Sequence, residues 1–420
     1  MELRADLHIH SKYSRATSRA MDIPHLTSAA ATKGIDLLGT GDFTHPAWRS
    51  ELKSWLEETP YEGVYEYGGV YFILQTEVNL AFRRGDRLHR IHLVVLAPDF
   101  EVAEEASTLM SRWGNLEADG RPTLSVEPPE FLEAILEIDP WVEVIPAHVW
   151  TPWYSLFGSR SGFDSVEEAF QDQSHRIHAL ETGLSSDPPM NWRLSSLDRY
   201  ALVSFSDAHS ANSLRLGREL TAFSVKEPSY REIVRALREP SHAALAYTVE
   251  VPPEYGKYHY DGHRSCGVRM HPKEAIRRGN TCPICGRQLT LGVLHRVEEL
   301  ADRPEGAISA NARPFYRLIP LREILTLAKE EGRLSEKPDV VYRKLVEEFG
   351  SEMRVLLSRN YQTLERLAGE TVAGVLRAMH SGDLLIDPGY DGVYGRLLLD
   401  SGSRELNRFR EFGDLTEFLS

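Results

Sequence analysis

The sequence has few cysteines and no long apolar run. Three cysteines occur in 420 residues, and all of them lie within one segment of twenty residues. This odd, clustered set favours metal ligation over disulfide bonds. No stretch approaches the ~18 consecutive apolar residues that a membrane-spanning helix needs, and the first residues lack the pattern of a signal peptide. We therefore expect a cytoplasmic protein with no membrane partner.

An excess of positive charge is also missing. The formal net charge is −14, with 26% charged and 42% hydrophobic residues. This charge argues against indiscriminate binding to nucleic acid. It excludes no nucleic-acid partner, because carboxylates that hold cations are counted as negative although the bound ions neutralise them. The length predicts two or three domains.

Strand-like and helix-like segments alternate over residues 3–247. Asp22 and Gly34 are typical of the start and the end of a helix. Strands are expected at residues 3–9, 35–40, 70–80, 91–97, 142–147, 177–181 and 201–206, and further helices at 101–112, 129–138 and 165–170. This alternation predicts the α/β class, either a parallel-stranded barrel or a doubly wound sheet.

Side chains that bind metals stand where these strands end. His8 and His10 are two residues apart on one strand, so both point to the same face. The other strand-end residues are Asp42, Glu77, His148, Glu181, Asp207 and His209, whereas His92 lies at the start of its strand. Barrel enzymes place their chemistry at the carboxyl ends of the strands. The pattern therefore predicts a metal centre at this edge.

A second metal-binding pattern follows residue 250. The pairs His263-x-x-Cys266 and Cys282-x-x-Cys285 are separated by fifteen residues, which is typical of a structural zinc site. His259 and His271 are alternatives for the fourth ligand. Residues 254–300 hold eight Lys or Arg residues against five acidic ones, and a compact basic module of this kind can hold a phosphate backbone.

The chain divides into three parts on this pattern. Residues 1–247 form the α/β part, and residues 251–256 have the composition of a linker before a zinc-binding module at 254–312. Apolar residues recur at three-to-four spacing at 321–331, 340–349, 352–357, 364–368 and 372–380. This spacing predicts a mainly helical C-terminal region at 313–420, with a short hairpin formed by residues 384–386 and 394–399.

Several motifs resemble the polymerase-and-histidinol-phosphatase (PHP) family. Residues 6–11, Asp-Leu-His-Ile-His-Ser, resemble its first motif, and residues 206–209, Ser-Asp-Ala-His, resemble its last. The stretches 39–46, 76–77 and 146–148 fall between them in the family's order. Residues 151–159, the cysteine-bearing segment and residues 292–303 resemble a DNA repair branch of the family. The resemblance implies a distorted (β/α) PHP-type barrel, followed by a small zinc-binding module and a mainly helical C-terminal region.

The resemblance also implies up to three divalent metals, which are zinc, manganese or magnesium ions. His92 is preferred over His89, because their parity puts the two rings on opposite faces of the strand. The chain departs from many family members in placing two residues between Asp42 and His45. The implied ligands are His8, His10 and Asp207 for one metal, Glu77 as a bridge to a second metal completed by His92 and His148, and Asp42, His45 and His209 for the third.

The function implied by the resemblance is that of a metal-dependent DNA repair endonuclease at the nucleoid. Such an enzyme cleaves on the 5′ side of uracil, hypoxanthine, xanthine and abasic sites, with Asp207, Glu77 and His10 as its catalytic residues. Damaged DNA is the expected partner, alongside other DNA repair or replication proteins.

Three further residues are expected to bind this substrate. Lys12 and Arg15 are placed to clamp a phosphate oxygen, with a solvated loop as the alternative. Trp153 belongs to an aromatic group, completed by Trp150, Tyr154 and Phe157, that is expected to line a pocket for the flipped base or to stack on its neighbours. Ordinary core packing is the alternative for each of these rings.

Two other functions fit the same ligands. One is a PHP-type phosphomonoesterase that acts on a small phosphorylated metabolite. The other is a non-catalytic binder of damaged DNA with structural metals. The zinc-binding module and the helical region favour the nuclease, because a small substrate requires neither of them.

Overall fold

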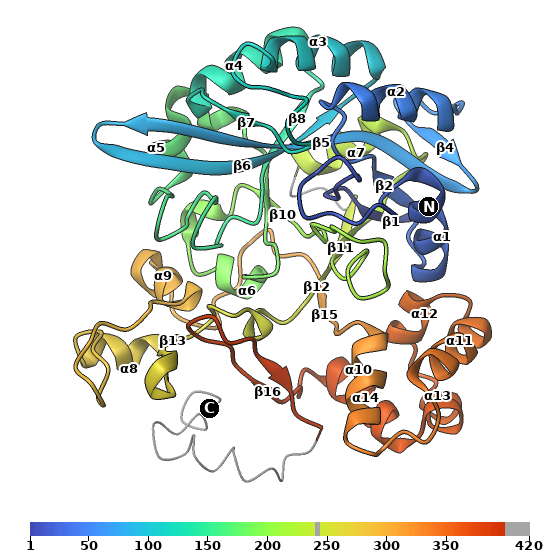
Figure 1. Ribbon diagram of the computed structural model, residues 1–420, viewed down its shortest axis with the longest axis vertical. Coiled ribbons are helices and arrows are strands. Elements are labelled where there is room, and N and C mark those ends of the chain that lie inside the picture. The colour runs from blue at the N-terminus through green and yellow to red at the C-terminus, as the bar shows by residue number, and fades with distance from the viewer. Residues whose placement is uncertain (240–243, 400–420) are drawn as a thin grey trace.

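The computed structural model describes residues 1–239 and 244–399 (Figure 1). A mixed 11-stranded sheet forms its core. β1 (Glu2–Asp6) pairs in parallel with β2 (Leu37–Gly39), which pairs in parallel with β5 (Val70–Arg84). The predicted α/β class is confirmed, and each predicted strand has a counterpart. The first strand ends at Asp6 rather than at residue 9. Glu77, predicted at a strand end, and His92, predicted at a strand start, both lie inside longer strands at residues 70–84 and 87–97.

The sheet differs from the parallel arrangement that the alternation predicts. β6 (Arg87–Ala97) folds back on β5 as a long antiparallel hairpin, and β8 (Glu143–Pro146) pairs antiparallel with β6. On the other edge, β11 (Leu220–Ser224) lies antiparallel to both β1 and β12 (Leu245–Glu250). Buried strands of either direction read as continuous apolar runs, so the hydrophobic pattern does not reveal the direction.

Short strands and helices complete this part. The remaining strands are β3 (Glu57–Glu58), β4 (Tyr65–Tyr67), β7 (Thr123–Leu124), β9 (Ala179–Glu181) and β10 (Ala201–Val203). The helices are α1 (Ile23–Lys33), α2 (Pro46–Trp55), α3 (Phe100–Met110), α4 (Pro128–Ile138), α5 (Val166–Phe170), α6 (Pro188–Asn191) and α7 (Tyr230–Arg238). α3 and α4 cover the top of the sheet in Figure 1.

The ends of α1 follow the sequence signals. The Asp22 carboxylate accepts a hydrogen bond from the His25 N–H, which satisfies a donor that the first helical turn leaves free. Gly34 ends the helix in the left-handed conformation, at a φ of 82°. Both predicted boundaries of this helix are therefore confirmed.

The cysteine-bearing segment forms a small unit below the sheet (Figure 1). β13 (Asp261–His263) and β14 (Val268–Met270) pair antiparallel, and α8 (Pro272–Arg277) and α9 (Val293–Leu300) follow them. Residues 253–255, which the composition assigns to a linker, form one turn of 3₁₀ helix.

The C-terminal region contains the predicted helices. They are α10 (Leu321–Glu330), α11 (Pro338–Phe349), α12 (Glu352–Leu357), α13 (Tyr361–Ala368) and α14 (Glu370–Ser381), and β16 (Ile386–Asp387) and β17 (Arg396–Leu397) form the predicted hairpin. β15 (Phe315–Arg317) joins the main sheet by pairing in parallel with β12. A buried ion pair of 2.9 Å between Lys33 Nζ and Glu352 Oε1 connects α1 with α12. Within the described residues, no helix is both long and apolar enough to cross a membrane.

Candidate metal centre

Three strand-end residues have unusual backbone conformations. Asp42, His148 and Asp207 have φ values of 46°, 32° and 47°. A left-handed conformation at a residue other than glycine costs about 1–3 kcal/mol and persists where the surrounding structure imposes it. The neighbouring glycines are equally constrained, since a Cβ on Gly120 would lie 2.4 Å from Asp42 Oδ2 and one on Gly183 would lie 2.5 Å from His148 Cβ.

The first group of metal-capable side chains comprises His8, His10, Glu77 and Asp207. Each offers one ligand atom, and these four atoms lie within 4.8 Å of one another. His10 Nε2 lies 3.0 Å from Asp207 Oδ1 and 3.2 Å from Glu77 Oε2. His8 Nε2 is buried without a hydrogen-bond partner among the described residues, at 3.6 Å from Glu77 Oε2. An unpartnered imidazole nitrogen facing carboxylates is well suited to a cation.

The second group consists of Glu77, His92 and His148. His92 Nδ1 lies 2.6 Å from Glu77 Oε1 and has no hydrogen bond of acceptable geometry. His148 Nε2 lies 3.1 Å from the same oxygen. Glu77 thus presents Oε2 to the first group and Oε1 to the second, which is the arrangement of a carboxylate that bridges two sites.

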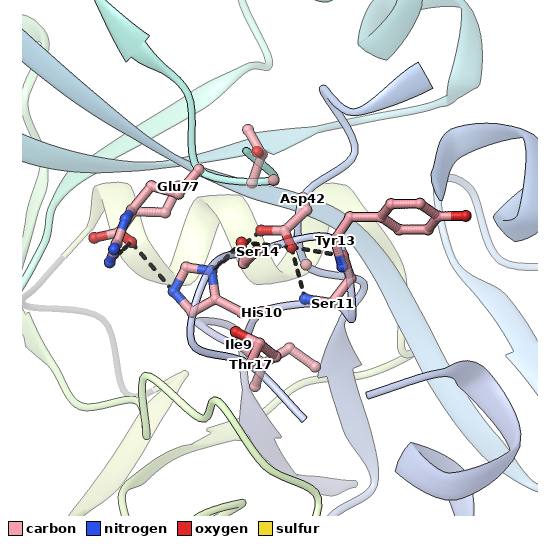
Figure 2. Close-up of polar contacts among 12 residues, drawn as sticks. Ile9, His10, Ser11, Tyr13, Ser14, Thr17, Asp42 and Glu77 are labelled. Atoms are coloured by element: carbon pink, nitrogen blue, oxygen red, sulfur yellow. Dashed lines mark hydrogen bonds and ion pairs between the residues drawn. The ribbon is translucent and has the colours of Figure 1, made fainter. Parts of the chain in front are cut away.

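Two further carboxylates orient the histidines of the first group. Glu181 Oε1 lies 2.9 Å from His8 Nδ1, and Glu181 Oε2 accepts a hydrogen bond from the His148 backbone N–H. Asp42 Oδ1 lies 3.1 Å from His10 Nδ1 (Figure 2). Carboxylates behind metal-binding histidines fix the tautomer and leave the other ring nitrogen free for the ion.

Strong electrostatic coupling follows from this packing. Burial opposes protonation of His8, but Glu181 and Glu77 outweigh it and raise the pKa of His8 well above its usual value. Burial would raise the pKa of Glu77, but His92 and His8 hold the pKa of Glu77 well below its usual value. The pKa of His92 is lowered to about 4 by burial. The fold therefore keeps charged carboxylates inside the protein, where positive charge must balance them.

The cysteine-bearing unit contains a separate group. His263, Cys266, Cys282 and Cys285 each offer a ligand atom within 4.8 Å of the others. His259 and His271 lie outside this group, and His271 Nδ1 instead accepts a hydrogen bond from the Lys273 N–H at the start of α8.

The Cys282 thiol is prepared for metal binding. Desolvation raises its pKa, but hydrogen bonds from the backbone N–H groups of Cys285 and Ile284 outweigh this effect and lower the pKa of Cys282 to about 6. A thiolate at neutral pH is the form that binds zinc.

Comparison with solved structures shows two full-length similarities. The lesion-specific endonuclease PfuEndoQ from Pyrococcus furiosus is 32% identical, with a TM-score of 0.85, and the match covers 97% of this chain and 99% of that one. A complex of endonuclease Q with a 27-mer duplex substrate, which carries an abasic lesion at the active site, is also 32% identical. Its TM-score is 0.82, with coverage of 96% and 97% of the two chains.

The chain belongs to the endonuclease Q family. The similarity confirms the resemblance to a DNA repair nuclease and the mixed α/β fold class with a helical C-terminal region.

Two uncharacterised proteins are similar to this chain in sequence. An uncharacterised Bacillus subtilis protein, YqxK, is 27% identical over 94% of this chain and 99% of its own length. An uncharacterised Methanocaldococcus jannaschii protein, MJ0043, is 31% identical over 59% of this chain, and the match spans 31% of that longer protein. Residues 320–383, which form the helical region, match the family model of the MJ0043 C-terminal domain.

Three residues predicted for a third metal lie outside both donor groups. Asp42 faces His10 Nδ1 and accepts hydrogen bonds from the Ser11 and Ser14 hydroxyl groups (Figure 2). His45 stacks on Tyr13 at 4.3 Å, and the His209 ring lies 4.3 Å from the His10 ring. The third metal stays a prediction for this member of the endonuclease Q family.

The predicted phosphate-binding residues have acidic partners. Lys12 Nζ lies 2.7 Å from Glu51 Oε2, and Arg15 Nε lies 3.5 Å from Asp119 Oδ2. Arg15 is largely exposed, so a phosphate can displace its partner more easily than that of Lys12. Trp153 is 43% exposed, and its neighbour Tyr154 packs against His92.

Two site residues are absent from the predicted ligand and substrate sets. Arg121 Nη1 lies 3.3 Å from Glu77 Oε2 and is the guanidinium group beside the bridging carboxylate. It lies in a loop between α3 and β7, where no periodicity or motif distinguishes it. Glu181 does have a signal, since it ends a predicted strand, but its role behind His8 depends on a contact between residues 173 positions apart.

Proposed function

We propose that this protein is a metal-dependent DNA repair endonuclease. It hydrolyses the phosphodiester bond on the 5′ side of uracil, hypoxanthine and xanthine and at abasic sites. The observation that carries the proposal is Glu77, whose two oxygens face two groups of potential metal ligands. Full-length similarity to a lesion-specific endonuclease and to a complex with abasic DNA supports the substrate class.

The donor set fits divalent cations. Mixed imidazole and carboxylate ligands suit zinc or manganese. His8 Nε2 and His92 Nδ1 are buried nitrogens that face Glu77 and form no hydrogen bond within the described residues. His8, His10, Glu77 and Asp207 would hold one ion, and Glu77, His92 and His148 would hold a second. Metals bound there lower the pKa of a coordinated water and stabilise the attacking and leaving oxygens of phosphoryl transfer.

The protein residues position the substrate and the ligands. Arg121 sits beside Glu77, and its pKa is raised because Glu77 and Asp207 outweigh the effect of burial. Its permanent positive charge can bind a non-bridging phosphate oxygen. Glu181 and Asp42 hold the rings of His8 and His10 in place. The Asp207 side chain is 30% exposed, and we expect the scissile phosphate to approach from this side.

The direct test uses labelled duplexes that each contain one uracil, hypoxanthine, xanthine or abasic site. An undamaged duplex and the Asp207→Asn variant are the controls. We expect nicking on the 5′ side of each lesion with Mn²⁺ or Mg²⁺, and none with the controls. Mapping of the product ends identifies the cleaved bond.

The same samples distinguish the phosphomonoesterase alternative. Turnover of p-nitrophenyl phosphate without nicking of any lesion duplex would replace the proposal with that activity. Specific binding of lesion duplexes without cleavage under any metal would favour the non-catalytic binder.

A further inference from the structure

A strip of exposed and half-buried rings and cations extends from His92 of the metal centre. It consists of Tyr154, Trp153, Tyr258 and Tyr394 with the cations Arg90 and Lys257, and we call it the aromatic strip. Trp153, Tyr154 and Tyr394 are among the most exposed large hydrophobic side chains of the described chain, with exposed fractions of 43%, 37% and 71%. Exposed aromatic residues in a connected row are typical of an interaction surface.

The inner end of the aromatic strip is fixed to the metal centre. The Tyr154 ring lies 5.1 Å from the His92 ring, and the Tyr154 carbonyl oxygen accepts a hydrogen bond from the His92 N–H. The Tyr154 N–H donates to Ser161 Oγ, and the backbone has a φ of 62°. Arg90 Nη1 donates to the Tyr154 hydroxyl group. A residue held in this strained conformation by its neighbours presents its ring in one orientation.

The outer part of the strip crosses to the C-terminal hairpin. Trp153 packs edge-on against Tyr258, with ring centroids 5.4 Å apart. Lys257 Nζ lies 5.6 Å from the centre of the Tyr258 ring and 5.7 Å from that of Tyr394. The Lys257 carbonyl oxygen accepts a hydrogen bond from the Gly392 N–H, which connects the two chain segments. Rings and a cation from three distant parts of the sequence therefore contact one another in this part of the strip.

The cations of the aromatic strip carry unbalanced charge. Neither Arg90 nor Lys257 forms an ion pair with a carboxylate of residues 1–239 or 244–399, and their contacts are with aromatic rings and a hydroxyl group. Elsewhere, Lys12 pairs with Glu51, and Lys53, which also lies over a ring, pairs with Glu104. Unpaired cations between exposed rings are complementary to a ligand with negative charge and flat apolar faces.

We propose that the aromatic strip binds unpaired nucleotides of the DNA strand that flanks the cleaved phosphate. This inference rests on the proposed function and adds the conformation of its substrate. Bases of an unpaired strand stack on aromatic side chains, while its phosphates pair with neighbouring cations. A duplex hides the faces of its bases, so it cannot use the rings. The enzyme therefore prefers a lesion whose flanking strand is unpaired.

The test measures how much an unpaired flank improves binding. Two labelled duplexes carry the same abasic analogue, one flanked by paired bases and one by a short unpaired oligo(dT) segment. Affinities are measured by fluorescence anisotropy in the full-length Asp207→Asn background, which prevents cleavage. The flank advantage is the ratio of the two dissociation constants. We expect Tyr394→Ala to reduce this ratio by roughly tenfold. For the duplex with the unpaired flank, Lys257→Gln should reduce the slope of log Kd against log salt concentration by about 0.7.

Matched variants away from the strip serve as controls. Tyr316 is 39% exposed and packs edge-on against Tyr247, and Lys53 lies over Phe100. Tyr316→Ala and Lys53→Gln should leave the flank advantage unchanged. Thermal denaturation identifies any variant that has lost its fold. If Tyr394→Ala does not fold, the salt dependence of binding by Lys257→Gln still tests the proposal.

The outcomes separate the two proposals. Equal flank advantages in Tyr394→Ala and Tyr316→Ala would overturn the assignment of the strip. Equal loss of affinity for the paired and the unpaired flank would also overturn it, because the strip would then bind duplex. Failure of the unmodified protein to nick any lesion duplex would instead refute the proposed function, and the binding assay does not depend on that reaction.

Discussion

The metal centre and the cysteine group are built in different ways. The ligands of the metal centre come from positions between His8 and Asp207 and meet only when the sheet has formed. The ligands of the cysteine group lie between His263 and Cys285, where a short hairpin and a tight turn bring them together. One site is a product of the whole fold, and the other organises its own segment.

The surroundings of the two sites differ as well. In the metal centre, Glu181 and Asp42 contact the far nitrogens of His8 and His10, and Asp207 is open to solvent. In the cysteine group, His263 Nδ1 has Cys285 Sγ as its neighbour at 3.6 Å. Oriented ligands with an open side are typical of a reaction centre, whereas a closed set of one histidine and three cysteines is typical of a structural zinc site.

The largest effect is expected from the bridging carboxylate. Glu77→Gln should reduce nicking of lesion duplexes by about a thousandfold or more, because a neutral amide no longer joins the two donor groups. Zinc bound by the cysteine group should remain. Nicking rates and metal content per chain test this, with Glu66→Gln, a carboxylate on β4, as the matched control. Activity within tenfold of the unmodified protein would contradict the role of Glu77 as a bridge.

Removal of a cysteine ligand should release the zinc but leave the ions of the metal centre in place, the reverse of the effect of Glu77→Gln. Cys282→Ser should lose one zinc per chain and destabilise the unit around it, because such units take folding free energy from the metal. The metal centre should keep its ions, since none of its ligands lies in that unit. Metal analysis and thermal denaturation provide the measurement. Simultaneous loss of the ions at Glu77 would show that the two sites are not independent.

A smaller effect is expected behind His8. Glu181→Gln should weaken metal binding by about 10- to 100-fold, the usual cost of losing a carboxylate behind a metal-binding histidine. Glu143 makes a similar contact of 3.1 Å with His178 away from the centre, so Glu143→Gln is the control. Titration of the metal-depleted centre with Mn²⁺ measures both. Equal affinities for the two variants would limit Glu181 to a structural role.

The smallest effect concerns a buried carboxyl group outside the donor groups. Burial raises the pKa of Glu250 to about 8, whereas Glu77 has a lowered pKa. A raised folded-state pKa stabilises the protein below the ordinary carboxyl pKa, and this contribution is lost as the pH rises from about 4.5 towards 8. Glu250→Gln should therefore raise Tm relative to the unmodified protein at pH 8 more than at pH 5, by roughly 2–4 °C. Parallel Tm profiles of the two proteins would contradict a buried, protonated Glu250.

The sequence predicts more of the cysteine group than of the metal centre. The cysteine group follows from local spacing alone. His8 and His10 are predicted as ligands from strand parity, although β1 ends at Asp6 and both residues lie beyond it. The pairings of β15 with β12 and of β8 with β6 could not be predicted, because apolar runs do not encode distant neighbours. The antiparallel pairing of β5 with β6 does have a local signal, the two-residue turn Gly85-Asp86. Arg121 lies in an irregular loop, and the position of Asp42 behind His10 depends on two adjoining strands, so both required the tertiary structure.

Anomalous X-ray scattering tests the central comparison most directly. Crystals of the full chain soaked in Mn²⁺ would be measured at the zinc and manganese absorption edges. We predict ions on both sides of Glu77, one held by His8, His10 and Asp207 and the other by His92 and His148, with zinc between His263 and the three cysteines. A single ion that leaves His92 and His148 without metal, or no ion in contact with Glu77, would contradict the account.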